Sequence, residues 1–331
     1  MKEFAYQRAT AVHDALSAVA ADTGARYLGG GTNLVDLMKN GVEEPTRLVD
    51  VRRLPLDGVR DAPDGGLVIG ATTTNSDAAA HPEVRRRFPA LSQAVLAGAS
   101  GQLRNMATVG GNLLQRTRCG YFTDLSRPCN KRVPGSGCAA ITGAHHNHAV
   151  LGHSEHCAAT HPSDMAVALA AFDAVVRYQT LDGAGEIPLS RFYPPVGDRP
   201  DRETALPPGA LITAVVLPGA AVSPRSRYRK VRERASYAFA TVSVAAALDI
   251  HDGIVTHARI ALGGVASHPW RAEAAEAGLR GTRPTAERLR ICAEEALSDA
   301  KPLRDNAYKV TLARNLIQAV LSELTGTEMD R

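Results

Sequence analysis

Long apolar runs are absent from this sequence of 331 residues, and so is an apolar stretch close to its N-terminus. The longest strongly apolar run, residues 165–176, is shorter than the roughly 20 residues that cross a bilayer and contains Asp173. No membrane insertion is therefore expected. The opening MKEFAYQRAT has no apolar core after its lysine, so we expect no secretory signal in this chain and synthesis in the cytoplasm. A periplasmic location would require co-export with a partner subunit.

A strong charge of one sign is also missing. The 38 lysines and arginines exceed the 34 aspartates and glutamates by only four, and the two kinds alternate along much of the chain. Nucleic-acid binding, which depends on concentrated positive charge, is therefore not expected. No repeat of the solenoid kind occurs, and 331 residues suffice for two or three compact units.

Strand and helix patterns alternate along most of the sequence and predict an α+β protein. Strands are expected at residues 26–28, 47–51, 67–71, 211–217, 243–250 and 254–262. An apolar helix is expected at 163–174 and a linker at 218–224. The last helix has one apolar stripe, formed by Val310, Ala313, Ile317, Val320, Leu321 and Leu324.

The periodicity stops between residues 115 and 160, where Arg, Cys, Pro, Gly, His and Asn dominate. An irregular loop of this length inside a compact domain is unusual, and it is normally functional or disordered. Because an apolar helix follows at once, we interpret 115–160 as an insertion into a domain that resumes after it.

Two glycine-rich segments are the first candidates for a ligand site, residues 29–34 (GGGTNL) and 104–113 (RNMATVGGNL). Glycines allow backbone N–H groups to approach a phosphate closely, and the first segment lies between a predicted strand and a predicted helix. The spacing is not the G-x-G-x-x-G of Rossmann folds, which disfavours that fold. Taken alone, the triple glycine is equally compatible with a tight structural turn and with a phosphate cradle.

Together the two segments resemble the FAD-binding subunit or domain of the xanthine dehydrogenase family, which carries a G-G-T-[DN]-L loop and a later R-N-x-A-T-[IV]-G-G-N loop. The resemblance extends over essentially the whole chain, because residues 230–234 (KVRER) look like the start of the family's C-terminal flavoprotein domain. It implies an α+β, vanillyl-alcohol-oxidase-type FAD-binding fold of two subdomains, followed by a smaller α+β C-terminal domain. Placed on this sequence, these units are residues 1–52, residues 53–220 with the insertion at 115–160, and residues 224–326.

The resemblance also implies which residues contact FAD. Around the pyrophosphate it places Arg26, Tyr27, Leu28, Gly29, Gly30, Gly31, Thr32, Asn33, Leu34, Thr108, Gly110, Gly111 and Asn112. Near the flavin it places Asp164, Leu211 or Ile212, and Lys230. A cation there would stabilise the anionic reduced flavin. Simpler roles remain open for two of these residues: Asp164 as a helix N-cap, and Lys230 as a solvated surface lysine.

Four of the five cysteines lie in the insertion: Cys119, Cys129, Cys138 and Cys157. In a chain without an export signal, clustered cysteines favour a metal or cluster site over disulfides. Their spacing contains no C-x2-C pair, unlike that of zinc ribbons and ferredoxins. The fifth, Cys292, lies alone on a predicted helix and is expected to be a small buried side chain.

The insertion resembles the [4Fe-4S]-bearing insertion in the flavin subunits of bacterial periplasmic aldehyde oxidoreductases and, with other spacing, of 4-hydroxybenzoyl-CoA reductase. The stretches R-C-x-Y-F, C-N-K-R-x-P-G-x-G-C and H-P-S-D-M carry this resemblance. It implies that the four cysteines hold a [4Fe-4S] cluster; a structural zinc ion, or free or disulfide-bonded cysteines, are the alternatives. Four thiolates complete a cubane, so we expect the histidines in solvent or against the ligands: His145, His146, His148, His153 and His156.

The basic residues of the insertion predict a positive surround for such a cluster, whose thiolates make it negative. Between residues 115 and 160 the only acidic residues are Asp124 and Glu155. They are outnumbered by Arg116, Arg118, Arg127, Lys131 and Arg132.

No molybdopterin site and no nucleophile–base pair is apparent in the sequence, so we expect no catalytic residue for substrate oxidation in this chain. The resemblance implies a heterotrimer in which a molybdenum-cofactor large subunit oxidises an aldehyde and a [2Fe-2S] small subunit relays electrons. FAD and the [4Fe-4S] cluster of this chain would pass the electrons to an external acceptor. Two alternatives stay open: a self-contained FAD oxidase on the same fold, and a metal-stabilised docking scaffold.

Overall fold

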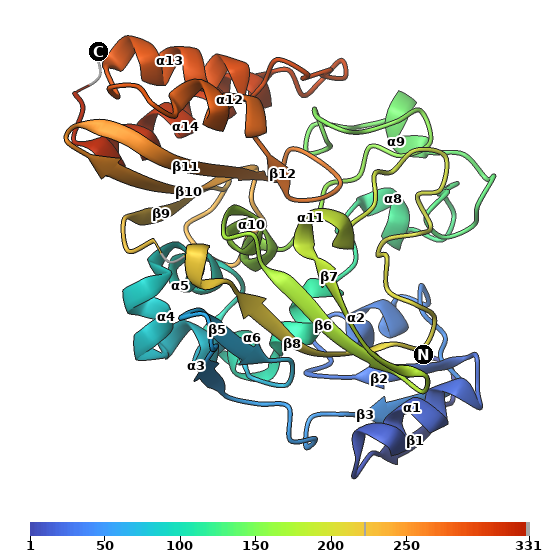
Figure 1. The fold of residues 1–331 in the computed structure, drawn as a ribbon. Coiled ribbons are helices and arrows are strands. Elements are labelled where there is room, and N and C mark those ends of the chain that lie inside the picture. Colours follow the sequence, from blue (N-terminus) through green and yellow to red (C-terminus); the bar gives the residue numbers. More distant parts are fainter. Residues whose placement is uncertain (222, 329–331) are drawn as a thin grey trace.

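The computed structural model describes residues 1–221 and 223–328, and it contains three sheets with their helices (Figure 1). The N-terminal unit is a parallel sheet in the order β1-β3-β2. Its elements are β1 (Ala5–Arg8), α1 (Val12–Ala20), β2 (Ala25–Leu28), α2 (Leu34–Lys39) and β3 (Arg47–Asp50). The expected succession of helix, strand, glycine loop, helix and strand is confirmed. The expectation did not include β1, because this short strand is mostly exposed and has no apolar alternation.

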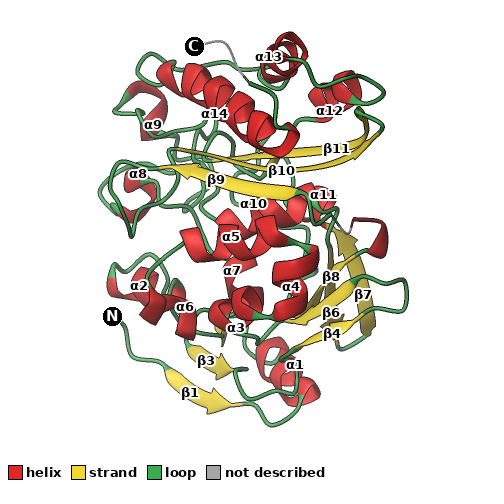
Figure 2. Ribbon diagram, turned by 90° about the vertical axis from the view of Figure 1, so that its left-hand side faces the viewer, coloured by secondary structure: helices red, strands yellow, loops and turns green. Residues whose placement is uncertain are grey.

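The middle unit is a five-stranded antiparallel sheet in the order β4-β5-β8-β6-β7, packed on a group of helices (Figure 2). Phe88 and Phe172 meet edge to face in its core, with ring centroids 5.1 Å apart. The elements before the insertion are β4 (Val59–Asp61), β5 (Leu67–Gly70), α3 (Asn75–Ala80), α4 (Pro82–Arg87), α5 (Pro89–Ala97), α6 (Gly101–Met106) and α7 (Val109–Leu113). Those after it are α10 (Asp164–Ala171), β6 (Val175–Thr180), β7 (Gly183–Pro188), α11 (Leu189–Phe192) and β8 (Leu211–Leu217).

The insertion between α7 and α10 is almost free of regular structure. It contains two single-turn helices, α8 (Gly120–Thr123) and α9 (Ala139–Thr142). Isolated β-bridges join Cys129 to Cys138 and Ser154 to Cys157. The loops lie beside the C-terminal unit in Figure 1. The predicted break in periodicity is therefore confirmed.

The C-terminal unit is a four-stranded antiparallel sheet in the order β12-β11-β10-β9, with three helices over its outer face (Figure 2). The expected apolar stripe of the last helix packs into this core. Cys292 is fully buried there, as predicted. The elements are β9 (Ser226–Val231), β10 (Val242–His251), β11 (Ile254–Gly263), β12 (Trp270–Arg271), α12 (Glu273–Leu279), α13 (Ala286–Glu295) and α14 (Tyr308–Thr325).

The segment predicted as a linker, residues 218–224, contains a 3-10 turn, η1 (Gly219–Ala221), and its residue 222 lies outside the described residues. Within the described part of the chain, no helix combines the length and the apolar character that a bilayer-crossing segment needs.

Candidate functional site

The two glycine-rich segments meet in space. A Cβ atom on Gly30 would lie 1.8 Å from the carbonyl oxygen of Met106, and one on Gly29 would lie 2.8 Å from Oγ1 of Thr108. Neither position has room for a side chain, because Gly30 meets the backbone of the second segment and Gly29 meets its Thr108 side chain. The structure therefore brings together the two segments that the sequence paired.

Each segment is held by its own hydrogen bonds. Thr108 caps α7, where its Oγ1 accepts a hydrogen bond from the backbone N–H of Gly111 at 3.2 Å. Oδ1 of Asn33 accepts one from the backbone N–H of Arg116 at 2.9 Å. Nδ2 of Asn33 is buried and has no partner among the described residues. Since buried polar groups are normally hydrogen-bonded, this amide donor fits a ligand with acceptor oxygens.

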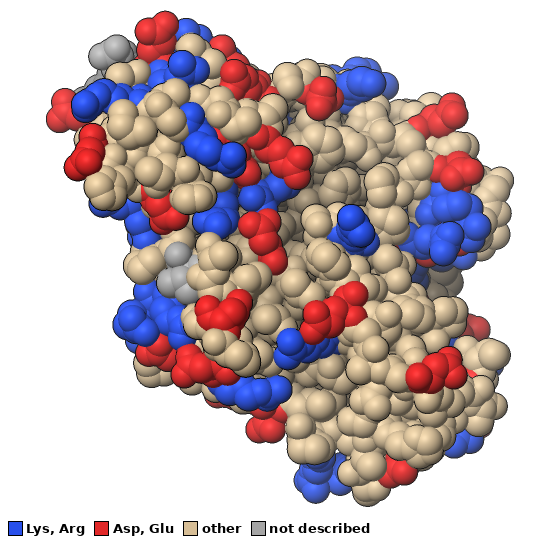
Figure 3. Space-filling model, in the orientation of Figure 1, with Lys and Arg blue, Asp and Glu red and all other residues tan. Residues whose placement is uncertain are grey.

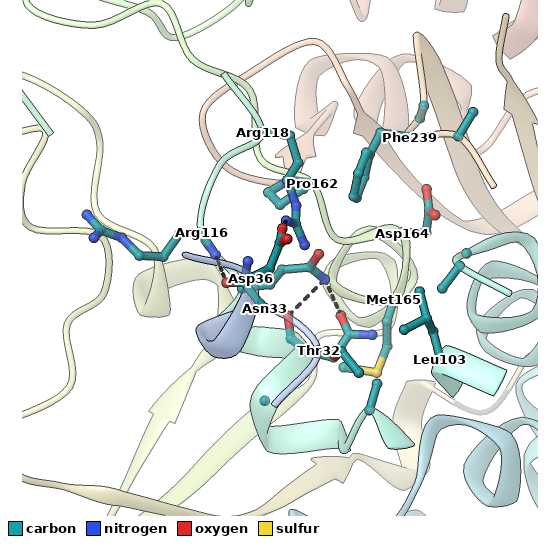
Figure 4. A pocket seen from close by; sticks show the side chains of 18 of the residues that line it. Thr32, Asn33, Asp36, Leu103, Arg116, Arg118, Pro162, Asp164, Met165 and Phe239 are labelled. Carbon is teal, nitrogen blue, oxygen red and sulfur yellow. Dashed lines mark hydrogen bonds and ion pairs between the residues drawn. The ribbon is translucent and has the colours of Figure 1, made fainter. Parts of the chain in front are cut away.

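A cavity of about 1250 Å³ lies between the two segments, the start of α10 and the loop that follows β9 (Figure 4). It is larger than the roughly 300–1,000 Å³ of ordinary small-molecule pockets, which suits an extended dinucleotide. In Figure 4, Thr32 and Asn33 lie on the opposite side of the cavity from Phe239. The predicted contact residues that line it are Arg26, Gly29, Gly30, Gly31, Thr32, Asn33, Leu34, Thr108, Gly111, Asn112, Asp164 and Lys230.

Five predicted contact residues do not line the cavity. Tyr27 donates its hydroxyl hydrogen to the carbonyl of Gly209 at 2.7 Å. Gly110 packs on Ala71, which a Cβ atom would approach to 3.2 Å. Leu28 follows Tyr27 on β2, and Leu211 and Ile212 are buried on β8; none of the three is among the lining residues.

Asp164 and Lys230 form a buried ion pair in the cavity wall. Nζ of Lys230 lies 2.7 Å from Oδ2 of Asp164, and the two side chains are 3% and 8% exposed. The hydroxyl of Tyr228 donates to Oδ1 of the same carboxylate at 2.5 Å. Burial and the adjacent carboxylate hold the pKa of Tyr228 well above its ordinary value. The pair therefore presents a cation whose charge is balanced within the protein.

The simpler roles considered for these two residues are wrong. Ser163, not Asp164, is the N-cap of α10, and its Oγ accepts from the backbone N–H of Ala166 at 2.9 Å. Lys230 is buried rather than solvated because β9 packs against α5, whose Ala97 carbonyl also accepts from Nζ at 3.2 Å.

A second group at the cavity was not predicted from the sequence. Nη1 of Arg118 lies 3.2 Å from Oδ2 of Asp36, and its guanidinium carbon lies 5.0 Å from the ring centroid of Phe239. Burial lowers the pKa of Arg118. Phe239 and Tyr237 belong to the loop between β9 and β10 and are 49% and 56% exposed. The only sequence signal for this group was a pair of aromatic residues in a segment between two strands.

Residues 2–220 match the family described as the FAD binding domain in molybdopterin dehydrogenase. The chain belongs to that FAD-binding family. Residues 226–324 match the CO dehydrogenase flavoprotein C-terminal domain. The FAD-binding domain contributes the cavity wall up to Met165, and the flavoprotein domain contributes Lys230 and the loop with Phe239. The cavity therefore lies between the two matched domains, and its unpaired Asn33 amide donor and glycine-lined wall suit a dinucleotide such as FAD.

Relatives of this FAD-binding chain are subunits of oxidoreductases, and it is likewise an oxidoreductase subunit. It is 51% identical over 325 residues to the aldehyde oxidoreductase FAD-binding subunit PaoB of Escherichia coli, covering 98% of both chains. It is 26% identical to the carbon monoxide dehydrogenase medium chain of Hydrogenophaga pseudoflava, covering 90% of this chain and 88% of that one.

Solved structures share the fold. The structure titled reconstituted CO dehydrogenase from Oligotropha carboxidovorans matches with a TM-score of 0.77 at 23% identity and covers 99% of both chains. The carbon monoxide dehydrogenase structure from H. pseudoflava matches with a TM-score of 0.75 at 26% identity. The predicted α+β FAD-binding fold with a C-terminal flavoprotein domain is confirmed.

The four cysteines of the insertion lie close together and form no disulfide in the described structure. An isolated β-bridge joins Cys129 to Cys138, and the thiols of Cys138 and Cys157 are close enough to shift each other's pKa. Cys119 packs against the small apolar group that contains Cys129 and against a second that contains Cys157. No set of three or more His, Cys, Asp or Glu side chains in the described residues is arranged to hold a single metal ion.

The thiols differ in how readily they ionise. The hydrogen bond from Cys157 lowers the pKa of Cys138 to about 6, and the same bond raises the pKa of Cys157. Burial raises the pKa of Cys119.

The positive charge expected around the cysteine site is only partly present, because acidic residues from outside the insertion pair with its basic residues. Arg116 lies 2.5 Å from Glu43 and 2.8 Å from Glu203, and Lys131 lies 3.6 Å from Glu203. A count of charges within 115–160 could not include these partners, which are distant in the chain. Arg127 remains largely exposed. On the face drawn in Figure 3, acidic and basic side chains are interspersed.

One of the five histidines contacts a cysteine. Nε2 of His148 lies 3.2 Å from Sγ of Cys119, and the residue is 8% exposed. His145 is also buried, with Nδ1 3.1 Å from the carbonyl of Ala140. His146 stacks on Tyr308, Nε2 of His153 lies 2.7 Å from the carbonyl of Lys301, and His156 is half-buried.

Proposed function

We propose that this chain is the FAD- and [4Fe-4S]-binding electron-transfer subunit of a molybdenum-dependent aldehyde oxidoreductase. Partner subunits with molybdenum and [2Fe-2S] centres would deliver electrons, and FAD would pass them to an external acceptor. The observation that carries the proposal is the cavity between two touching glycine segments, in a chain 51% identical to an aldehyde oxidoreductase FAD-binding subunit.

For the cofactor itself, we propose that the lining residues of the two glycine segments hold the pyrophosphate. The side chain of Asn33 would donate its unpaired amide hydrogen to the pyrophosphate. Gly29, Gly30 and Gly31 would let backbone N–H groups approach the phosphate oxygens closely. Asp164 and Lys230 would lie near the isoalloxazine. When bound, FAD would supply chemistry that links one-electron transfer to two-electron transfer. The fixed Lys230 cation would stabilise the negative charge of the reduced ring, with Asp164 holding Nζ in place.

We further propose that Cys119, Cys129, Cys138 and Cys157 hold the [4Fe-4S] cluster. Their mutual contacts support a shared site. We retain the division into residues 1–52, 53–220 with the insertion at 115–160, and 224–326 as part of this proposal.

Co-purification from the native host, followed by cofactor analysis, tests the proposal. The complex should contain molybdenum, FAD and, in this chain, about four iron and four sulfide per polypeptide. Zinc in place of iron would refute the cluster while leaving FAD untouched. A chain without flavin absorbance would favour the docking scaffold. Aldehyde turnover by the isolated chain would favour a self-contained oxidase.

A further inference from the structure

We propose that His148 sets the reduction potential of the cluster through a hydrogen bond to Cys119, at the side of the cysteine site that borders the FAD cavity. The inference rests on the proposed [4Fe-4S] cluster. Nε2 of His148 lies 3.2 Å from Sγ of Cys119. Both residues line the cavity, whereas Cys129, Cys138 and Cys157 are not among its lining residues. His148 therefore contacts the one cysteine that lies between the cluster site and the FAD site.

The imidazole is the donor in this contact. A thiolate ligand has no hydrogen to give, so nitrogen and sulfur attract each other only when Nε2 carries the hydrogen. His148 is 8% exposed as a residue, so water competes little for this hydrogen.

His148 is held from behind by α14 and the residues before it. Its carbonyl oxygen accepts from Nζ of Lys309 at 3.0 Å and from Nδ2 of Asn306 at 3.2 Å. Lys309 and Asn306 have no exposed surface. The Lys309 ammonium also donates to the carbonyls of Asn147 and Gly264, at 3.2 and 2.5 Å, so its three hydrogens are all used within the protein. Lys309 is thus a positioning residue, which ties the insertion to the C-terminal domain.

The direction of the effect follows from charge. One-electron reduction makes the cluster and its thiolates more negative, so the bond from His148 is stronger in the reduced state. The hydrogen stays on Nε2 in both states. A hydrogen bond to a cluster sulfur therefore raises the reduction potential, and its removal lowers it.

An equilibrium redox titration of the purified complex, followed by cluster absorbance and paramagnetic resonance, measures this effect. His148→Phe keeps a ring and removes the donor. At the parental midpoint, we expect its ratio of reduced to oxidised cluster to fall about tenfold, which is about 59 mV for a one-electron couple. His148→Gln, which retains an N–H donor, should recover part of the shift. His153→Phe is the matched control, since His153 contacts Lys301 and no cysteine, and should keep the parental midpoint.

Iron analysis of the parent complex comes first and separates the two hypotheses. A parent without iron counts against the cluster itself. If the parent contains iron and His148→Phe has the same midpoint, the proposed role of His148 is overturned. The role is also overturned if His148→Phe loses iron but retains flavin, because a residue that only tunes the potential is not needed to hold the cluster. Lys309→Met should lower the midpoint and broaden the resonance signal. An unaltered signal and midpoint in Lys309→Met would overturn its positioning role.

Discussion

Single residues determine whether the cavity between the two glycine segments can form. At Gly30 the limit is steric, because the carbonyl of Met106 occupies the place of a side chain. At Asp164 it is electrostatic, because a buried carboxylate needs both Lys230 and Tyr228. Sequence motifs pointed to both positions, but the reason for each lies in a partner distant in the chain.

Gly30→Ala should separate the two glycine segments. We expect flavin occupancy to fall strongly and the flavin-free chain to lose about 1–3 kcal/mol of stability, since the new methyl group has no space. The absorbance ratio of flavin to protein and a urea titration measure the two effects. Gly101→Ala is the control, because a Cβ there meets no atom within 4 Å. Equal flavin content in both variants would contradict the close-contact argument.

Lys230→Met should destabilise the chain by about 3–5 kcal/mol, because it leaves the buried Asp164 carboxylate without its cation. Adding Asp164→Leu should recover most of this loss, since the unpaired charge is then gone. Urea unfolding of the flavin-free single and double variants measures both steps. A double variant less stable than Lys230→Met would show that the pair is not the dominant interaction.

Acid should destabilise the protein through His161. Burial lowers its folded-state pKa to about 3, from an ordinary value of 6.5. Between these pH values the unfolded chain binds the extra proton, so this contribution is present above pH 6.5 and is lost as the pH falls towards 3. From pH 6.5 to 4 the loss is about 2–3 kcal/mol. In urea titrations, the free energy of unfolding of His161→Phe should fall less over that pH interval than that of the parent. The control His251→Phe, at an exposed position, should lose as much as the parent. An equal loss in all three proteins would contradict the role given to His161.

At the scale of elements, α10 links the two halves of the cavity. Ser163 caps this helix, and its hydroxyl also donates to Oδ1 of Asn112 at 2.6 Å, in the second glycine segment. The first residue of the helix, Asp164, then meets Lys230 on β9. Helix start, glycine segment and C-terminal strand are thereby fixed relative to one another.

Ser163→Ala should therefore affect both stability and cofactor binding. Loss of the cap should cost about 1 kcal/mol, and loss of the bond to Asn112 should lower flavin affinity. Thr285→Ala provides a matched control, since Thr285 caps α13 in the C-terminal unit away from the cavity. We expect Thr285→Ala to lose about as much stability in urea titrations as Ser163→Ala, but to bind flavin with the affinity of the parent. If both variants bind flavin alike, the link from α10 to the second glycine segment is unimportant for the cofactor.

At the scale of the whole molecule, the cavity proposed to hold FAD lies where both domains and the insertion meet. The insertion contributes Cys119 and His148 to the cavity wall, yet most of its residues lie outside the wall. Its start is bonded to the first glycine segment, where the backbone N–H of Arg116 donates to Asn33, and a later part is attached to the C-terminal domain by Lys309 and Asn306. None of the four cysteines makes these hydrogen bonds, so loss of the cluster should leave the FAD-binding fold intact.

Cys129→Ser tests that separation. The variant should lose the broad cluster absorbance and its iron, because one of four thiolates is replaced, yet retain flavin. Absorbance spectra and iron analysis of the purified complex measure both. Cys292→Ser, at a buried cysteine outside the insertion, should keep its iron. Loss of flavin together with iron in Cys129→Ser would mean that the insertion supports the FAD-binding fold.

The sequence by itself determined the α+β class, the two glycine segments, the aperiodic insertion and most of the strands. These features depend on residue patterns that are local in the chain, such as periodicity, glycine and cysteine spacing. Only the tertiary structure decided that Ser163 rather than Asp164 caps α10, that Glu43 and Glu203 neutralise Arg116, and that Arg118, Asp36 and Phe239 meet at the cavity. The contacts of Arg116 and of Arg118 join side chains far apart in the chain, and how the three sheets pack sets these contacts. The cap of α10 is local, and the residue at which the helix begins decides it.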